Sequence, residues 1–224
     1  MSTPYSELVR GIRIEKGFSQ SELADKLGIS RASYAAIEQG KRELTLSECE
    51  KISQALGITF SDIERGEIPN YEKYKQMILV YLRMNEYLTK TKLAKLLYFA
   101  DFSWYYHHLK SMSGMEYRKI QYGPVADTYF RLIDEMSDAG EIAITLKEEG
   151  AMHISQTSTG AKHSIDQVSA EEDSLMKKIN AKWKGTKTAE IVSYTHKQLP
   201  YMFADDNEIV SYEIFGQENP DEIY

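Results

Sequence analysis

Four polar side chains between residues 19 and 42 are of the types that contact nucleic acids: Gln20, Arg31, Lys41 and Arg42. Arginine, lysine and glutamine commonly hydrogen-bond to DNA phosphates. A guanidinium such as that of Arg31 can also donate two parallel hydrogen bonds to O6 and N7 of guanine. The sequence gives these four positions no obvious packing purpose. We therefore interpret them as candidate DNA contacts.

Two short helices joined by a glycine must position these side chains. Ser19 is a favourable N-cap, and Glu22 stands three residues later, where a capping box places it. Gly28 follows the first helix and can adopt the positive φ that ends it. Ser30 caps a second helix, which ends near Gly40. Two helices of about eight to ten residues joined by a glycine-containing turn are typical of a helix-turn-helix.

The run from Gln20 to Arg31, followed by Ile37-Glu38-x-Gly40-Lys41-Arg42, resembles the Xre/Cro-type DNA-binding domain of phage and plasmid repressors. The resemblance covers residues 1–66 and implies a domain of five helices. We expect its other helices at residues 8–16, 46–56 and 60–63.

By this resemblance, the second helix of the motif enters the major groove of DNA. It would present four residues to base edges or nearby phosphates: Arg31, Ala32, Ser33 and Ala36. The resemblance assigns Gln20 to the phosphate backbone, and Lys41 and Arg42 to the phosphates that follow. Ala32 and Ala36 are short, which favours recognition of DNA shape over direct base contacts.

The charge of this segment is not that of a broad basic surface. Residues 1–66 hold nine Lys+Arg and ten Asp+Glu, a net charge of −1. DNA binding must therefore depend on a few locally placed cations. We expect a dimer to bind two half-sites about 34 Å apart. The alternative is a helical hairpin without a nucleic-acid role.

The chain is long enough for a second domain. It has 224 residues, 42% of them hydrophobic, and Gly66 and Pro69 interrupt the helical periodicity between Glu64 and Asn70. We therefore expect domains at 1–66 and 71–224. The single cysteine, Cys49, excludes an internal disulfide framework and is interpreted as a small buried residue. With no leader peptide and no long apolar run, a cytoplasmic location is expected.

Residues 71–224 read as a mostly helical domain with a small β-hairpin, so the fold class is mainly α. An amphipathic helix begins at Tyr71, and a second, apolar on most faces, begins after Thr89 or Thr91 and forms the centre of the domain. Alternating apolar residues predict a hairpin between residues 142 and 154. Further helices are expected at Pro124 to Gly140, after the Ser169-x-x-Glu172 capping box, and at Thr188 to His196.

Two features of the second domain bear on its surface. The acidic end, residues 205–224, is predicted to be partly disordered or loosely strand-like. The chain has 16 tyrosines, more than a core of this size needs. Because exposed tyrosine is favoured in protein interfaces, we expect some of them to contact a partner.

The sequence lacks the motifs of an enzyme. It has no His-x-x-x-His, Cys-x-x-Cys, Gly-x-Ser-x-Gly or glycine-rich phosphate loop, so no catalytic residue, metal or cofactor is expected. A polar cluster of Asp101, Tyr122 and His196 is the best remaining site candidate in the second domain. We interpret it as domain-stabilising or as a contact for a protein partner rather than catalytic. Asp101 on its own is expected to be a buried hydrogen-bond hub.

A second resemblance suggests a partner. The run Lys92-Leu93-x-Lys95-Leu96-Leu97-Tyr98-Phe99-Ala100-Asp101, with Tyr122-Gly123-Pro124-Val125 and Tyr194-Thr195-His196, resembles the Panacea domain across about residues 71–215. That resemblance implies an antitoxin, which binds and neutralises a toxin encoded beside it. Residues 67–224 carry −6 of the net charge of −7, since the first 66 carry −1. Such a surface suits a basic toxin.

Two functions follow as hypotheses. The first is an antitoxin that neutralises a cognate protein toxin through its second domain and represses its own promoter through its first, as a homodimer or a larger toxin–antitoxin complex. The alternative is a phage or mobile-element regulator whose second domain senses a ligand or drives oligomerisation. Operator DNA is a partner in both, and no membrane contact is expected in either. An enzyme with an appended DNA-binding domain is a weaker third option.

Overall fold

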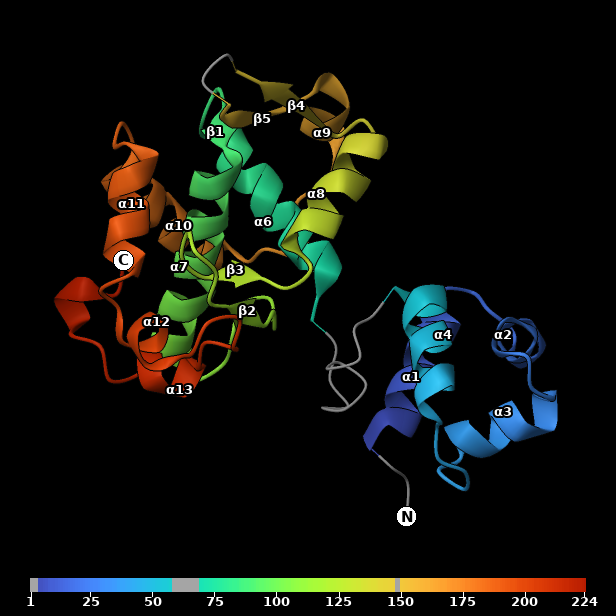
Figure 1. Ribbon diagram of the computed structural model, residues 1–224. Helices are drawn as coiled ribbons and strands as arrows, with labels where there is room; N and C mark the ends of the chain where they lie inside the picture. The colour runs from blue at the N-terminus through green and yellow to red at the C-terminus, as the bar shows by residue number, and fades with distance from the viewer. Residues whose placement is uncertain (1–3, 58–68, 148–149) are drawn as a thin grey trace. The chain divides into compact units, whose positions relative to one another are not determined.

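The computed structural model describes residues 4–57, 69–147 and 150–224 of the chain. The chain divides into two compact units, Met1–Pro69 and Asn70–Tyr224 (Figure 1). Each unit has its own buried core, and each is described by itself below.

The first unit is a cluster of short helices. They are α1 (Pro4–Glu15), α2 (Gln20–Leu27), α3 (Arg31–Glu38) and α4 (Leu46–Leu56). Their apolar faces meet in a core that contains Val9, Leu23, Tyr34, Ile37 and Ile52, each fully buried. Cys49 is also buried in this unit. The fifth helix expected at residues 60–63 lies outside the described residues.

The predicted helix ends of the turn motif are confirmed. The Ser19 hydroxyl accepts from the Glu22 amide, and the Glu22 side chain accepts from the Ser19 amide. Gly28 ends α2 with φ +74°. The Ser30 hydroxyl accepts from the amide of Ser33 and starts α3. Each helix end is satisfied by neighbouring groups, which is why α2 ends and α3 begins at the predicted residues.

The second unit is mostly helical, which confirms the predicted fold class. Its helices are α6 (Tyr71–Arg83), α7 (Lys90–His108), α8 (Tyr129–Asp138), α9 (Ser158–Lys162), α10 (Ala170–Trp183), α11 (Thr188–Thr195), α12 (Leu199–Phe203), α13 (Tyr212–Phe215) and the 3₁₀ turn η1 (Pro220–Glu222). Its strands are β1 (Leu88–Thr89), β2 (Tyr117–Arg118), β3 (Val125–Ala126), β4 (Ile142–Leu146) and β5 (Met152–Gln156).

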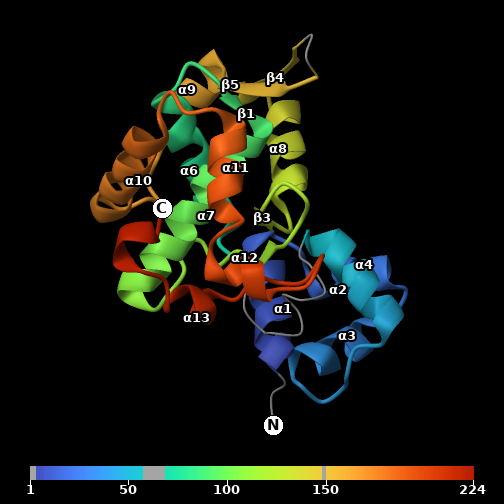
Figure 2. The ribbon, with the colours of Figure 1, turned by 60° about the vertical axis from the view of Figure 1, so that its left-hand side comes forward.

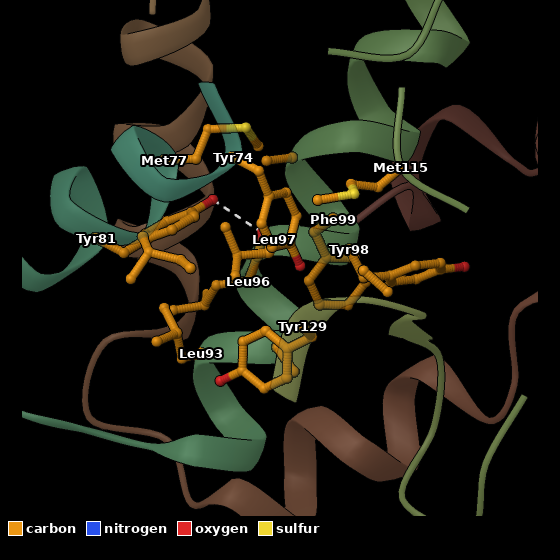
Figure 3. Close-up of a cluster of buried hydrophobic side chains, with 14 of the residues drawn as sticks. Tyr74, Met77, Tyr81, Leu93, Leu96, Leu97, Tyr98, Phe99, Met115 and Tyr129 are labelled. Carbon is orange, nitrogen blue, oxygen red and sulfur yellow. Dashed lines mark hydrogen bonds between the residues drawn. The ribbon is translucent and has the colours of Figure 1, made fainter. Parts of the chain in front are cut away.

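Helix α7 forms the centre of this unit, as predicted. Thr89 caps it by accepting from the Lys92 amide, and every residue from Lys92 to Ser103 is buried. A helix buried on all sides needs apolar side chains on most of its faces, which is the pattern of this segment. Helices α6, α10 and α11 pack against it (Figure 1, Figure 2), and Figure 3 shows its side chains packed against Tyr74 and Tyr81 of α6. The Tyr81 hydroxyl donates to the carbonyl of Leu96 at 3.0 Å.

The predicted hairpin is present as β4 and β5, with Ile144 opposite Ile154. Strand β1 adds to β5 on its other side and gives the order β1-β5-β4. The helix expected from Pro124 starts later than predicted, at Tyr129. Val125 and Ala126 instead form β3, which pairs with β2. The two buried side chains of β3 sit under α7, so tertiary packing outweighs the helix-start signal of the proline.

The expectation that the acidic end of the chain is partly disordered was wrong. The acidic end of the chain is folded, and Val210, Phe215 and Ile223 insert into the core. The ring of Phe215 packs edge-on against Phe102 at 5.2 Å. Six of the 16 tyrosines are essentially inaccessible: Tyr34, Tyr74, Tyr81, Tyr98, Tyr117 and Tyr129. Tyr87 and Tyr122 are exposed, so the expectation that some tyrosines contact a partner stays a prediction.

Candidate nucleic-acid interface

Helix α3 presents one accessible face. Tyr34, Ile37 and Glu38 point into the core, whereas Arg31 and Ala32 are exposed and Ser33 and Ala36 are half-buried. The four residues predicted for base recognition therefore share the face that solvent reaches: Arg31, Ala32, Ser33 and Ala36. Arg31 is the longest of them and the only one with a charge, so it has the greatest reach toward a DNA groove.

A buried carboxylate on the opposite side of α3 bonds to the two preceding helices. Glu38 accepts two hydrogen bonds from Arg13, at 2.5 and 3.1 Å, and one from the Gln20 amide at 2.9 Å. Burial raises the pKa of Glu38, but the bonds from Arg13 and Gln20 outweigh it and hold this pKa below its usual range. One ionised carboxylate thus joins α1, α2 and α3.

Gln20 has a packing purpose that the sequence did not reveal. One N–H of its side-chain amide is committed to Glu38. The amide group carries a second N–H, which is the one that remains for a phosphate. The contact with Glu38 fixes the position of Gln20 at the start of α2, so the group is held in place before any DNA binds.

Arg42 is likewise anchored, whereas Lys41 is exposed. The Arg42 Nη2 atom donates to Glu48 Oε1 at 2.7 Å, and Glu48 also accepts from the amide of Thr45. Burial raises the pKa of Glu48, but the bonds from Arg42 and Thr45 hold it below its usual range. About a third of the Arg42 side chain is accessible, at 34%. The expectation that neither Gln20 nor Arg42 packs against the domain was therefore wrong.

The second predicted cluster does not form. Asp101 is fully buried and bonds to a different set of groups: the amide and hydroxyl of Ser113 at 2.7 and 2.5 Å, the Tyr117 hydroxyl at 2.7 Å and the Ser111 hydroxyl at 3.0 Å. Burial raises the pKa of Asp101, although these donors partly offset the effect. The residue is the structural hub that the sequence suggested, built from serines and a tyrosine.

Tyr122 and His196 lie apart from that hub. Tyr122 is on the surface, 58% exposed. The His196 ring stacks on Tyr201, with the centroids 4.3 Å apart. Among the described residues, none of the hydrogen bonds of Asp101 goes to Tyr122 or His196. Asp101 is thus separate from the other two, whereas the segments of Tyr122 and His196 meet where Gly123 lies against Thr195.

Lys95, on the same helix as Asp101, is a buried contact between segments that was not predicted from the sequence. Its side chain is 1% exposed, and its ammonium donates to the carbonyl of Pro124. Burial lowers the pKa of Lys95 to about 7. Gly123 lies against Lys95 and Thr195 so closely that a Cβ there would come within 2.5 Å of the Thr195 hydroxyl. The three segments that resemble the Panacea domain, residues 92–101, 122–125 and 194–196, therefore meet around this amine.

Two kinds of feature are absent from the part of the chain that the structure describes. In residues 4–57, 69–147 and 150–224, no group of three or more His, Cys, Asp or Glu side chains lies close enough to hold a metal ion. No described helix is both long and apolar enough to cross a membrane.

One known protein family matches a segment of each unit. The family described as "Helix-turn-helix" matches residues 9–63, and "Antitoxin SocA-like, Panacea domain" matches residues 93–200. Both matches agree with the resemblances drawn from the sequence. Neither family is described as an enzyme. No solved structure matches the chain.

Individual relatives match over about a quarter of the chain. The chain is 41% identical over 66 residues to control protein C.MunI of a Mycoplasma species, covering 27% of this chain and 89% of that protein. It is 38% identical over 60 residues to control protein C.BamHI of Bacillus amyloliquefaciens, covering 26% and 74%. It is 37% identical over 62 residues to the prophage-derived HTH-type transcriptional regulator YonR of Bacillus subtilis, covering 28% of this chain and 57% of YonR.

Proposed function

We propose that this chain, which belongs to the helix-turn-helix family of transcriptional regulators and carries a Panacea domain, is an antitoxin that represses its own promoter. The first unit binds operator DNA, and the second binds and neutralises a toxin encoded beside it. The observation that carries the proposal is the fusion of the two domains in one chain.

The arrangement of α3 supports the DNA-binding half. Arg31 is exposed at the start of that helix, and Gln20 is held by a buried carboxylate at the start of α2. Residues 1–66 have a net charge of −1, so a few placed groups rather than a basic field must supply the affinity. A dimer on two half-sites doubles those contacts, and the relatives named as regulators and control proteins suit such a role.

The toxin-binding half is supported by the description of the second family as antitoxin SocA-like. Residues 67–224 carry a net charge of −6. A surface of that sign accelerates association with a basic partner, such as a protein that acts on RNA or nucleotides.

One observation favours the alternative, a phage or mobile-element regulator with a second domain that senses a ligand or drives oligomerisation. Two relatives of the first unit are named as prophage-derived or phage regulators, YonR and RstR of Vibrio cholerae. Under this alternative a small ligand changes the affinity for the operator, and the adjacent gene is not toxic.

The proposal is tested in two assays on the full chain. A reporter driven by the DNA upstream of its own gene reports repression, which the wild type gives and Arg31→Ala loses. Co-expression with the adjacent gene reports neutralisation, with arrested growth expected for the neighbour alone and normal growth for the pair. Repression combined with a harmless neighbour would support the alternative.

A further inference from the structure

The second unit contains a largely apolar pocket of about 430 Å³. Its lining comes from the start of α7, the start of α8, residues 120–125 and the hairpin residues 150–152. Figure 1 shows the α7 end concerned, next to β1 and the β4–β5 hairpin. Ala94, Ile120 and Val125 form part of its apolar wall, and Lys95 borders it. A cavity of this size can take one large side chain or a small ligand.

Three large apolar side chains that line this pocket are exposed to solvent for about half of their surface. Tyr122 is 58% exposed, Phe130 47% and Met152 46%. Leu146, which pairs with Met152 across the hairpin, is 67% exposed. Several exposed large apolar residues around one depression mark a surface that a partner covers.

Phe130 is not needed by the core of its own helix. The buried face of α8 consists of Tyr129, Leu132, Ile133 and Met136. Phe130 lies off that face and contacts the Tyr129 ring edge-on at 5.4 Å. The core of the unit therefore does not require Phe130. A large aromatic side chain that stays partly exposed in the free protein is typical of an interface anchor.

The described charged residues of the lining are both lysines, Lys90 and Lys95. The ammonium of Lys95 is committed to the carbonyl of Pro124. The ammonium of Lys90 lies 5.1 Å from the centre of the Phe130 ring, and Lys90 as a whole is half-buried. A partner group that fills the pocket thus meets a hydrogen-bond donor beside the ring, and it should bring an acceptor.

We propose that this pocket is where the toxin docks. It receives one large aliphatic or aromatic side chain of the toxin, while Lys90 binds a carboxylate or carbonyl next to that side chain. The inference rests on the proposed function and adds the surface and the chemistry of the contact. Most of the lining lies within residues 93–200, the segment matched by the antitoxin SocA-like family. An apolar pocket with aromatic rim residues is the usual setting of a binding hot spot.

The experiment measures the Kd of the full chain for the product of the adjacent gene by isothermal titration calorimetry. Phe130→Asp and Lys90→Glu change the pocket. Phe203→Asp, at a phenylalanine 70% exposed on α12, and Lys110→Glu, at an exposed lysine after α7, introduce the same charges elsewhere. We expect Phe130→Asp to weaken binding at least about 30-fold and Lys90→Glu about 10-fold, with the controls within about threefold of wild type.

Each other outcome has a defined meaning. If the wild type binds and the pocket variants bind as well as their controls, the docking site is wrong while the proposed function stands. If the wild type does not bind the neighbour's product, the proposed function and this inference both fail. Sedimentation velocity of the chain alone adds a third arm, because self-association that Phe130→Asp abolishes would assign the pocket to a second copy and overturn the proposal. Circular dichroism confirms that all variants are folded.

Discussion

Arg13 on α1 forms a two-point ion pair with Glu38 at the end of α3, with Nε 2.5 Å from Oε1 and Nη2 3.1 Å from Oε2. The two side chains are only 11% and 3% exposed. The same carboxylate accepts from Gln20 on α2. The helix that carries Arg31 is therefore oriented by a charge pair on its opposite, buried face.

Arg13→Ala should destabilise the first unit by about 3 kcal/mol, because it leaves the Glu38 carboxylate buried without its partner. Amide hydrogen exchange at residues 31–38, read by mass spectrometry, should show protection reduced about 100-fold. Arg10→Ala, at an exposed arginine of the same helix, is the control. Equal protection in the two variants would show that the ion pair does not hold α3.

Arg31→Ala should weaken operator binding by about 1–3 kcal/mol, because it removes the charged group that reaches furthest from α3. The loss should be largest on the native operator and smaller on one with the contacted base pair changed. Fluorescence anisotropy at fixed salt measures both affinities. A loss of the same size on every sequence would reassign Arg31 from base recognition to phosphate binding.

Local signals in the first unit were sufficient to predict its turn motif. The helix starts are set by hydrogen bonds from amides within three residues to Ser19, Glu22 and Ser30, and the end of α2 is set by the positive φ of Gly28. The positions of these residues in the sequence therefore determine where α2 begins and ends and where α3 begins. The partners of Gln20 and Arg42 could not be predicted in this way. Gln20 bonds to a residue 18 positions away, and that contact exists only once the helices have packed.

Gly123→Ala should destabilise the second unit by more than Gly140→Ala does. Both glycines have positive φ, +87° and +69°, so alanine strains the backbone at each by about 1 kcal/mol. Only at Gly123 does the new Cβ also meet another residue, 2.5 Å from the Thr195 hydroxyl, whereas Gly140 has nothing within 4 Å. Thermal unfolding should show at least twice the loss of Tm for Gly123→Ala. Equal losses would show that the contact with Thr195 is easily relieved.

The stability contributed by Lys95 should depend on pH. Its folded pKa, about 7, lies below its ordinary value of 10.5, so between these two pH values the unfolded chain binds more protons than the folded one. The unfolding free energy of the wild type should therefore rise relative to that of Lys95→Met, by about 2 kcal/mol between pH 7 and pH 9. Urea denaturation at several pH values measures the difference.

The comparison has an internal control in Lys110→Met, at an exposed lysine of the same unit. If the difference between wild type and Lys95→Met changes with pH no more than that between wild type and Lys110→Met, the buried amine titrates as it does in water.

The second unit shows where sequence reasoning ended. Helix α7 and the hairpin were predicted because a continuous apolar run and a period of two are visible in one segment. The predicted cluster of Asp101, Tyr122 and His196 was wrong because the type of a polar residue does not indicate which segments of the chain pack together. Lys95 belongs to one of the Panacea-like motifs, but the carbonyl that accepts its hydrogen bond is that of Pro124, 29 residues later. Phe215 likewise belongs to a core that a charged flanking sequence concealed.

The most direct test of the antitoxin account is the growth of cells that express the adjacent gene with no partner, with the full chain, or with its Arg31→Ala variant, each from an independent promoter. The account predicts arrest by the neighbour alone and rescue by both forms of the chain, since neutralisation belongs to the second unit. Repression of the native promoter should be lost only with Arg31→Ala. A harmless neighbour, or arrest that persists beside a stably expressed chain, would contradict the account.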